Sequence, residues 1–247
     1  MKSTIKISFL ILTWNRYKFL AQCLTALIAS INNLDNCEII IMDNGSTDET
    51  AEVLDKYKNN KHFRFIKLKK NYGIKSYKKL FGMVESEYAV IVDDDVLSFP
   101  AGLDDIFNDY MTAYPDYGFV GLNVIQNEYT DGAKPPVEHY TEEVRGNKVI
   151  ERGPTGGWCT CFRRSDYRKV KWRFLFSSIS MKVAEDGMLS QLFHKRLKLK
   201  TGLIKNAVCF HACGPYYAKQ YGHLDREIAK YSASGLDDYV KRYQEFL

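Results

Sequence analysis

Three consecutive carboxylates interrupt the segment Tyr88–Pro100, which reads YAVIVDDDVLSFP. The apolar residues before them suit a strand inside a sheet, whereas Asp93, Asp94 and Asp95 repel one another and resist burial. A chain that places such a triplet after a buried strand either leaves it in water as a solvated turn or gives it a partner of opposite charge. The chemistry open to the triplet is to bind a divalent cation or to handle a phosphate-bearing ligand.

Other acidic clusters offer side chains of the same kind. Asp43 begins the turn Asp43-Asn44-Gly45-Ser46, and Glu185 and Asp186 form an acidic pair far along the chain. Taken singly, the first fits an Asx turn with a helix cap, and the second fits the first turn of a helix, where the helix dipole favours negative charge. The order of the clusters along the chain therefore has to decide between a structural and a chemical role.

Four cysteines suggest a competing metal chemistry. Cys159 and Cys161 alternate onto one face of a strand-like segment, and Cys209 and Cys213 flank His211 in another. Their C-x-C and C-x-x-x-C spacings are not those of common zinc modules. A zinc site is a minor alternative, and a histidine satisfied within the core is the structural interpretation of His211.

The elements that must position these side chains alternate in type. Continuous apolar runs suited to buried strands cover residues 5–12, 38–42, 63–68 and 88–92. Helical spacing predicts helices between them, over about 20–31, 46–57 and 74–83. At the start of the second helix, Ser46 and Glu49 have the spacing of a capping box.

This alternation indicates βαβ units and a parallel sheet that is buried on both faces. In sheets of this kind, ligands bind beyond the carboxyl ends of the strands. The clusters that begin at Thr13, Asp43 and Asp93 each follow such an end. We therefore expect all three to converge on one rim.

The second half of the chain is less regular. A helix to about Tyr114 and a strand over 118–124 precede a stretch rich in glycine, proline and charge, 126–157, with hairpin-like alternation near 144–150. From Leu224 onward, apolar and basic residues recur at helical spacing, which predicts a basic amphipathic terminal helix interrupted near Gly235. Such a helix either packs against its own domain or lies on a membrane surface.

The ordered set of motifs resembles the inverting family 2 glycosyltransferases with the GT-A fold. The resemblance runs from Ile5 to about His211. The matching pieces are Thr13-Trp14-Asn15-Arg16, Asp43-Asn44-Gly45-Ser46-Thr47-Asp48, Asn71-Tyr72-Gly73, the acidic triplet, Gly156-Gly157-Trp158, Glu185-Asp186 and Phe210-His211.

The resemblance implies an α/β fold of the GT-A, Rossmann-like type, with a mixed, mostly parallel sheet flanked by helices. We expect a single domain over 1–247, in which 1–125 bind the nucleotide sugar. Residues 126–247 would form a less regular half that binds the acceptor and ends in the amphipathic helix.

The same resemblance implies a divalent cation, Mn²⁺ or Mg²⁺, as cofactor. Asp95 and His211 match the metal ligands of the family, and a neutral imidazole is a reasonable ligand for Mn²⁺. Asp93 or Asp94 would touch the ribose or base of the nucleotide and orient the metal ligand. The cation would stabilise charge that develops on the departing diphosphate.

The resemblance also assigns the donor and catalytic residues. Asp186 matches the general base, with Glu185 as a supporting neighbour or acceptor ligand. Gly157 and Trp158 match the segment at the donor sugar and acceptor, where an indole can stack on a sugar or pack in the core. The remaining donor-binding positions are Thr13, Asn15, Arg16, Asp43, Asn71, Gly73 and Lys75; at Lys75 the chain departs from the family's commonest pattern, a small residue followed by Arg and Asn.

Composition and charge bound the partners. The 247 residues carry a formal charge of +5, but Lys and Arg outnumber Asp and Glu by 18 to 9 in residues 151–247. This bias suggests peripheral contact with an anionic membrane or a nucleic acid, or a solvated basic face. The N-terminal apolar run reads as a strand rather than a signal peptide, and no segment approaches the length of a bilayer span. We therefore expect a cytoplasmic protein, peripheral at most, with reduced cysteines.

The leading prediction is a metal-dependent inverting glycosyltransferase that moves a sugar from a nucleotide diphosphate, a UDP-sugar first of all, to an acceptor hydroxyl. The acceptor would be a carbohydrate or lipid-linked sugar in surface polysaccharide or glycoconjugate synthesis. The alternatives are a glycosyltransferase acting on a modified nucleic-acid base or a protein, a metal-dependent nucleotidyl or phosphoryl transferase, and a protein that binds nucleotide sugars without catalysis.

Overall fold

The computed structural model describes residues 5–131 and 134–247. Its strands are β1 Ile7–Thr13, β2 Cys37–Asp43, β3 Phe63–Lys67, β4 Tyr88–Asp93, β5 Val96–Ser98, β6 Tyr117–Val124, β7 Thr141–Arg145, β8 Lys148–Arg152, β9 Cys159–Arg163 and β10 Lys200–His211. Its α-helices are α1 Tyr17–Ser30, α2 Thr50–Asp55, α3 Tyr77–Phe81, α4 Leu103–Ala113, α5 Arg164–Leu175, α6 Glu185–Leu192, α7 Pro215–Gln220, α8 Leu224–Ala233 and α9 Asp237–Gln244.

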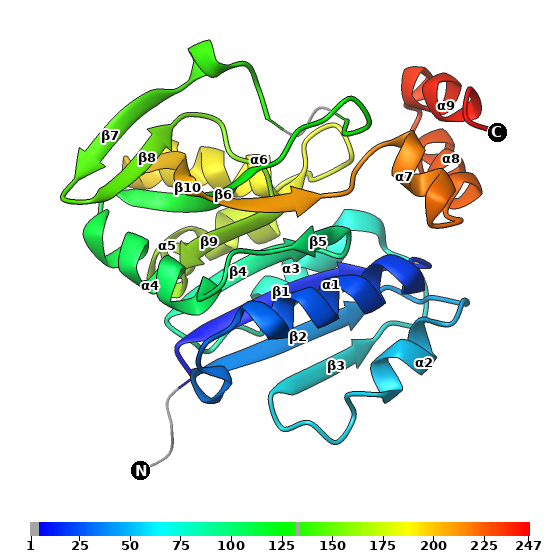
Figure 1. Ribbon diagram of the computed structural model, residues 1–247, viewed down its shortest axis with the longest axis horizontal. Coiled ribbons are helices and arrows are strands. Elements are labelled where there is room, and N and C mark those ends of the chain that lie inside the picture. The colour runs from blue at the N-terminus through cyan, green and yellow to red at the C-terminus, as the bar shows by residue number, and fades with distance from the viewer. Residues whose placement is uncertain (1–4, 132–133) are drawn as a thin grey trace.

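A single mixed sheet runs through the molecule in the order β3-β2-β1-β4-β9-β6-β10-β8-β7, and β5 pairs with β10 (Figure 1). The first four strands in this order are parallel to one another. β9 is antiparallel to both of its neighbours, β4 and β6, whereas β6 and β10 are parallel. The fold expected from the sequence, a GT-A sheet with a regular parallel first half, is confirmed.

Helices cover both faces of the sheet because successive strand residues point to opposite sides. On one face, Phe9 and Ile11 belong to a core that also takes in buried side chains of α1, α2 and α4. On the other face, Leu10 belongs to a core shared with α3, α5 and α6. Phe9, Leu10 and Ile11 of β1 are all fully buried although they point to both faces of the sheet. This explains why the sequence of β1 is continuously apolar rather than alternating.

The strand register brings the predicted polar clusters together. Thr13, the last residue of β1, is paired with Asp43 at the end of β2. On the other side of β1, Leu12 is paired with Asp93 at the end of β4. The expectation that these clusters meet on one rim of the sheet is therefore confirmed.

Local structure departs from the sequence-based prediction at α2. Ser46 was expected to cap this helix together with Glu49, but α2 begins only at Thr50 and has no side-chain cap. Instead, Asp48 Oδ1 accepts hydrogen bonds from the backbone N–H and the hydroxyl of Thr50, and Ser46 Oγ accepts one from the backbone N–H of Asn15. The capping-box prediction was wrong because the Ser46 hydroxyl accepts a hydrogen bond from the loop that contains Asn15, and not from the helix.

The C-terminal segment forms three helices beside the end of β10 (Figure 1). The predicted interruption is real, since Gly235 separates α8 from α9 with a positive φ of 62°. Leu224 and Tyr243 are buried together against Ala218 of α7, so these helices pack on their own chain. Within residues 5–131 and 134–247, no helix combines the length and hydrophobicity that crossing a bilayer would require.

Candidate active site

A cavity of about 720 Å³ opens at the carboxyl ends of β1 and β4, under the C-terminal helices. Most residues assigned to the site from sequence line it: Thr13, Arg16, Asn71, Gly73, Asp93, Asp94, Asp95, Gly157, Glu185, Asp186 and His211. Asn15, Asp43, Lys75 and Trp158 are not among the lining residues.

The three carboxylates of the triplet have different partners. Asp94 is held on both oxygens, since Thr13 Oγ1 and Arg16 Nη1 each donate to it at 2.7 Å. Asp95 lies between Arg16 Nη2 at 2.5 Å and His211 Nε2 at 3.0 Å. Asp93 is 3.6 Å from His211 Nε2 and is the most exposed of the three. Arg16 thus offsets the repulsion that the bare sequence presented.

Asp93, Asp95 and His211 form a group that could hold a metal ion. One ligand atom from each lies within 4.8 Å of the others, and the contacts to His211 Nε2 are 3.0 and 3.6 Å. Ligands about 2.1 Å from an octahedral cation sit roughly 3 Å apart in adjacent positions, so the spacing fits a hard divalent cation. The set differs from the sequence-based one by including Asp93, which had been assigned to the nucleotide.

The cysteine alternative finds no support in the part of the chain that the structure describes. No cysteine belongs to a group with metal-binding spacing there. Burial raises the pKa of the Cys209 and Cys213 thiols to about 12, and it raises that of Cys159 well above the ordinary value. Protonated thiols of this kind are poor metal ligands.

Electrostatics separate the members of the metal-binding group. Burial raises the pKa of Asp93 to about 7, helped by the neighbouring carboxylates. Burial acts on Asp95 too, but the cations Arg16 and His211 outweigh it and hold the pKa of Asp95 well below its usual range. Asp95 in turn raises the pKa of His211 against the effect of burial. A divalent cation here would favour the ionised carboxylates and a neutral imidazole.

Trp158 lies beneath the cavity and not in its wall. It is buried, its Nε1 donates to the Leu122 carbonyl at 2.9 Å, and its ring stacks near that of His211, with centroids 6.4 Å apart. Of the two roles considered for the indole, core packing matches this placement.

Glu185 and Asp186 begin α6, and both line the cavity. Gly157 is a direct neighbour of Asp186, since a Cβ at that position would lie in ordinary contact with Asp186 Oδ2, at 3.4 Å. Asp186 Oδ1 accepts a hydrogen bond from the Gly187 backbone N–H at 2.5 Å. Burial raises the pKa of Asp186 and, more strongly, that of Glu185. Two acidic groups with different proton affinities thus stand side by side.

The other predicted donor residues shape the loops around the cavity. Asn15, with a positive φ of 50°, accepts a hydrogen bond on Oδ1 from Thr47 N–H at 2.7 Å and so ties the first loop to the second. Asp43 Oδ1 accepts from Ser46 N–H at 2.8 Å, which is the Asx turn that its sequence also suggested. Lys75 is exposed.

Asn44 was not singled out from the sequence, yet it organises the third loop. Its Nδ2 donates to Asn71 Oδ1 and to the Gly73 carbonyl, at 2.8 and 3.1 Å. Its Oδ1 accepts from Tyr72 N–H and Ser76 Oγ, at 3.0 and 2.8 Å. The signal in the sequence was only an Asn-Gly turn, which gives no hint of contacts so far along the chain.

The wall formed by α8 was missed as well. Arg226, Glu227, Lys230 and Tyr231 line the cavity. Glu227 is buried and pairs with Arg226 and Lys230 of its own helix, while Arg16 Nε lies 3.6 Å from its Oε1. Although burial opposes them, Lys230, Arg226 and Arg16 lower the pKa of Glu227 to about 2. The sequence predicted a basic helix here, but it did not indicate that Glu227 is buried among the basic residues.

The architecture and the site now define a class of protein. The profile described as Glycosyl transferase family 2 matches residues 8–171. The chain belongs to glycosyl transferase family 2, and it is an enzyme of the glycosyltransferase type.

Individual relatives cover only part of the chain. Poly(ribitol-phosphate) beta-N-acetylglucosaminyltransferase TarP of Staphylococcus aureus (strain N315) is 33% identical over 107 residues, which are 42% of this chain and 32% of TarP. The corresponding enzyme TarS of strain Mu50 / ATCC 700699 is 27% identical over 93 residues, 37% of this chain and 16% of TarS. The chain therefore matches about a third or less of the length of these curated relatives.

Solved structures share the fold. The structure of S. aureus TarS 1-349 in complex with UDP-GlcNAc has a TM-score of 0.65 at 13% identity, covering 98% of this chain and 72% of that one. The mannosyltransferase PcManGT from Pyrobaculum calidifontis, in complex with GDP-Man and Mn²⁺, has a TM-score of 0.64 at 14% identity, covering 91% and 64%.

Proposed function

We propose that this chain is a metal-dependent, inverting glycosyltransferase that uses a UDP-sugar. The observation that carries the proposal is that the Asp93, Asp95 and His211 group and Asp186 line the same cavity. The first can hold a cation for a diphosphate, and the second can receive a proton. A UDP donor is supported by the structures of S. aureus TarS 1-349 in complex with UDP-GlcNAc and with UDP, which share the fold.

In this proposal, the donor lies along the carboxyl ends of β1 and β4. When bound, the divalent cation offsets the charge that develops on the diphosphate as the sugar bond breaks. Thr13, Asn71 and Gly73 line the part of the cavity where the nucleotide would lie. Arg16, which bridges Asp94 and Asp95, keeps the triplet oriented before any ligand arrives.

Asp186 is proposed as the general base. Its carboxylate would accept the proton of the acceptor hydroxyl as that oxygen attacks the anomeric carbon on the face opposite the diphosphate, which inverts the configuration. The pKa of Asp186 is raised by burial, which brings it closer to the neutral range, where general bases work best. Glu185 beside it would support the acceptor.

The acceptor is proposed to be a hydroxyl of a carbohydrate, of a lipid-linked sugar or of a related surface polymer. The relatives are named as poly(ribitol-phosphate) transferases, which supports a polymer with free hydroxyl groups as the acceptor. The division into a donor half, 1–125, and an acceptor half, 126–247, belongs to the same proposal. The family match gives no support to nucleotidyl or phosphoryl transfer.

The test is a panel of nucleotide sugars, with release of the nucleoside diphosphate measured with Mn²⁺, with Mg²⁺ and after chelation. We expect one UDP-sugar to be hydrolysed slowly without acceptor, and only with metal. Asp95→Ala and the milder Asp93→Asn should both weaken the Mn²⁺ dependence of UDP binding. Undiminished release after chelation, or cleavage within the diphosphate, would overturn the proposal.

A further inference from the structure

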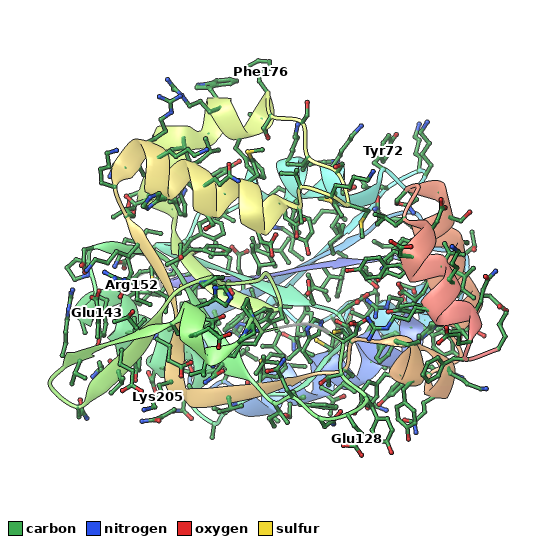
Figure 2. The ribbon with its side chains drawn as sticks, turned by 90° about the horizontal axis from the view of Figure 1, so that it is seen from above. Tyr72, Glu128, Glu143, Arg152, Phe176 and Lys205 are labelled. Atoms are coloured by element: carbon green, nitrogen blue, oxygen red, sulfur yellow. The ribbon has the colours of Figure 1, made fainter. Side chains whose placement is uncertain are left out.

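Helix α5 exposes an unusual combination of side chains. Arg168, Lys169, Trp172, Arg173 and Phe176 are all exposed, at the three- and four-residue spacing of a single helix face. Trp172 is 68% exposed and Phe176, just beyond the helix, is 83% exposed. Phe176 stands at the outer margin of the molecule in Figure 2. The outer face of α5 is therefore both basic and aromatic.

The two aromatic residues take no part in the core. Packing of α5 onto the sheet uses Tyr167, Val170 and Phe174, which are buried in the cluster shared with α3 and α6. Trp172 and Phe176 instead stack on each other, with ring centroids 6.3 Å apart and planes 21° apart. A soluble helix normally keeps such residues inside, so an exposed pair of them points to a binding surface.

The charges around this pair are nearly all positive. Asp166 is the only acidic residue of α5, and it is buried and paired with Lys169. Among the residues that the structure describes, Arg168 and Arg173 have no ion-pair partner within 4 Å. A depression of about 400 Å³ next to Trp172 is lined by basic residues and by the end of α3: Arg164, Arg168, Lys171, Phe81, Gly82 and Val84.

We propose that α5 is the docking face of this protein on an anionic lipid bilayer. Indole and phenyl rings prefer the headgroup region of a membrane, and basic residues beside them are attracted to anionic lipids. The stacked rings of Trp172 and Phe176 would enter the interface as one wedge. The cations of the adjacent depression would bind lipid phosphate.

A bilayer fits this face better than a single-stranded nucleic acid. Bases bind by stacking on aromatic rings that are spaced to receive them, inside a groove that follows the backbone. Trp172 and Phe176 stack on each other, both are exposed, and Phe176 lies at the margin of the molecule in Figure 2. Insertion into a lipid surface uses rings in that arrangement directly.

Docking through α5 would also place the cavity close to the membrane. Five residues beyond Phe176, Met181 already lines the cavity, and Glu185 follows at the start of α6. An extended chain of that length spans at most roughly 17 Å. Lys78 Nζ donates to the carbonyls of Leu175 and Ser177 at 2.9 and 2.6 Å, which fixes the end of α5. A lipid-anchored acceptor would thus be near the proposed base, but the docking itself does not depend on the proposed function.

The test is sedimentation of the full chain with vesicles of phosphatidylcholine, alone or mixed with phosphatidylglycerol. We expect binding to the mixed vesicles only, and less of it at high salt. Arg168→Glu with Arg173→Glu should weaken the binding at least about tenfold, since each basic residue near such a surface contributes several-fold in affinity. Trp172→Ala with Phe176→Ala should weaken it by a similar factor.

The matched control reverses two exposed lysines after α2, Lys56→Glu with Lys58→Glu. α2 packs on the face of the sheet opposite α5, and the change in net charge is the same. This control should keep most of the vesicle binding. The far-UV circular dichroism spectrum and the midpoint of urea unfolding should be unchanged in every variant, which shows that the α5 variants fold whether or not the proposed function holds.

Several outcomes would overturn the proposal. One is equal binding to neutral and mixed vesicles, or no binding to either. Another is an equal loss in the α2 control, which would mean that net charge alone matters. A third is binding of single-stranded RNA, but not of vesicles, that needs Arg168 and Arg173. The last is a dimer in solution that the Trp172→Ala, Phe176→Ala variant abolishes, which would make this face a self-interface.

Discussion

Asp93, Asp94 and Asp95 are adjacent in sequence but differ in what their neighbours allow them to do. Asp94 has both oxygens occupied by Thr13 and Arg16, so it is an anchor. Asp95 keeps one oxygen on Arg16 and turns the other to His211. Asp93, with only the more distant contact to His211, has the greatest freedom to meet a ligand. Burial and one arginine thus divide three identical side chains into separate roles.

The proposed base gives the sharpest test at the residue scale. Asp186→Asn keeps the shape of the side chain and removes its ability to accept a proton. We therefore expect normal binding of the donor and a loss of transfer of about 10² to 10⁴-fold. The measurement pairs UDP-sugar binding by calorimetry with transfer to an acceptor.

Glu185→Gln is the control for that experiment. Burial raises the pKa of Glu185 well above its usual range, so this carboxyl group holds a proton more tightly than a free glutamate does, and an amide of the same shape is a close substitute for it. We expect this variant to keep most of the transfer activity. Full activity in Asp186→Asn, with loss in Glu185→Gln, would exchange the two roles.

At the scale of elements, the ion pairs of buried Glu227 hold α8 against the rest of the chain. Glu227 lies among Arg226, Lys230 and Arg16, and the last of these precedes α1. Glu227→Gln would leave three cations facing a neutral side chain. Removing one partner of a buried ion pair costs roughly 3 to 5 kcal/mol, so the free energy of unfolding in urea should fall by about 3 kcal/mol.

An exposed acidic residue of α9 supplies the comparison. Asp238→Asn changes the net charge equally and should leave the free energy of unfolding within about 0.5 kcal/mol of the wild type. If Glu227→Gln were no more destabilising than Asp238→Asn, the buried cluster would not be what holds α8 in place.

The elements also show how far sequence reasoning reached. The convergence of Thr13, Asp43 and Asp93 followed from apolar runs whose carboxyl ends share one edge, and the register confirms it. Such reasoning works because strand ends in a parallel sheet are fixed by local pattern and topology. The resemblance to a known family added Asp186 and His211, which no local pattern could have linked to the triplet.

What the sequence could not provide were contacts made by packing. Asn44 holds a loop almost thirty residues away, and nothing in an Asn-Gly turn indicates that. From the sequence, Trp158 could have faced either a sugar or the core. Only the three-dimensional packing shows that it is buried beside His211. Ser46 was wrongly predicted to cap a helix, because its hydroxyl accepts a hydrogen bond from Asn15 at another strand end.

At the scale of the whole molecule, the excess basic residues of 151–247 lie in separate regions of the structure. Part of it, Arg226 and Lys230, faces the cavity around Glu227. Another part, on α5, faces outward beside Trp172 and Phe176. In our proposals, the first group of basic residues lies beside the bound ligand at one end of the sheet, and the second contacts a membrane at one of its faces.

The free energy of unfolding should depend on pH in a way that one buried histidine, His223, determines. His223 precedes α8 and packs on Phe19, with ring centroids 5.3 Å apart, and its Nε2 has no hydrogen-bond partner. Burial lowers the pKa of His223 to about 4, and the cations Arg16 and Arg226 act in the same direction. The folded protein therefore resists a protonation that the unfolded chain accepts near pH 6.5.

The sign of the pH dependence follows from that difference. Above about pH 6.5 His223 is neutral in both states and costs nothing. As the pH falls from there to about 4, only the unfolded chain takes up the proton, so the folded state loses roughly 3 kcal/mol from this group. Below about pH 4 both states are protonated, and the loss stops growing. We expect His223→Phe, measured by urea unfolding across this range, to lose stability less steeply than the wild type. The same substitution at exposed His194 should leave the slope unchanged, and a slope unaltered by His223→Phe would mean that acid acts on the fold elsewhere.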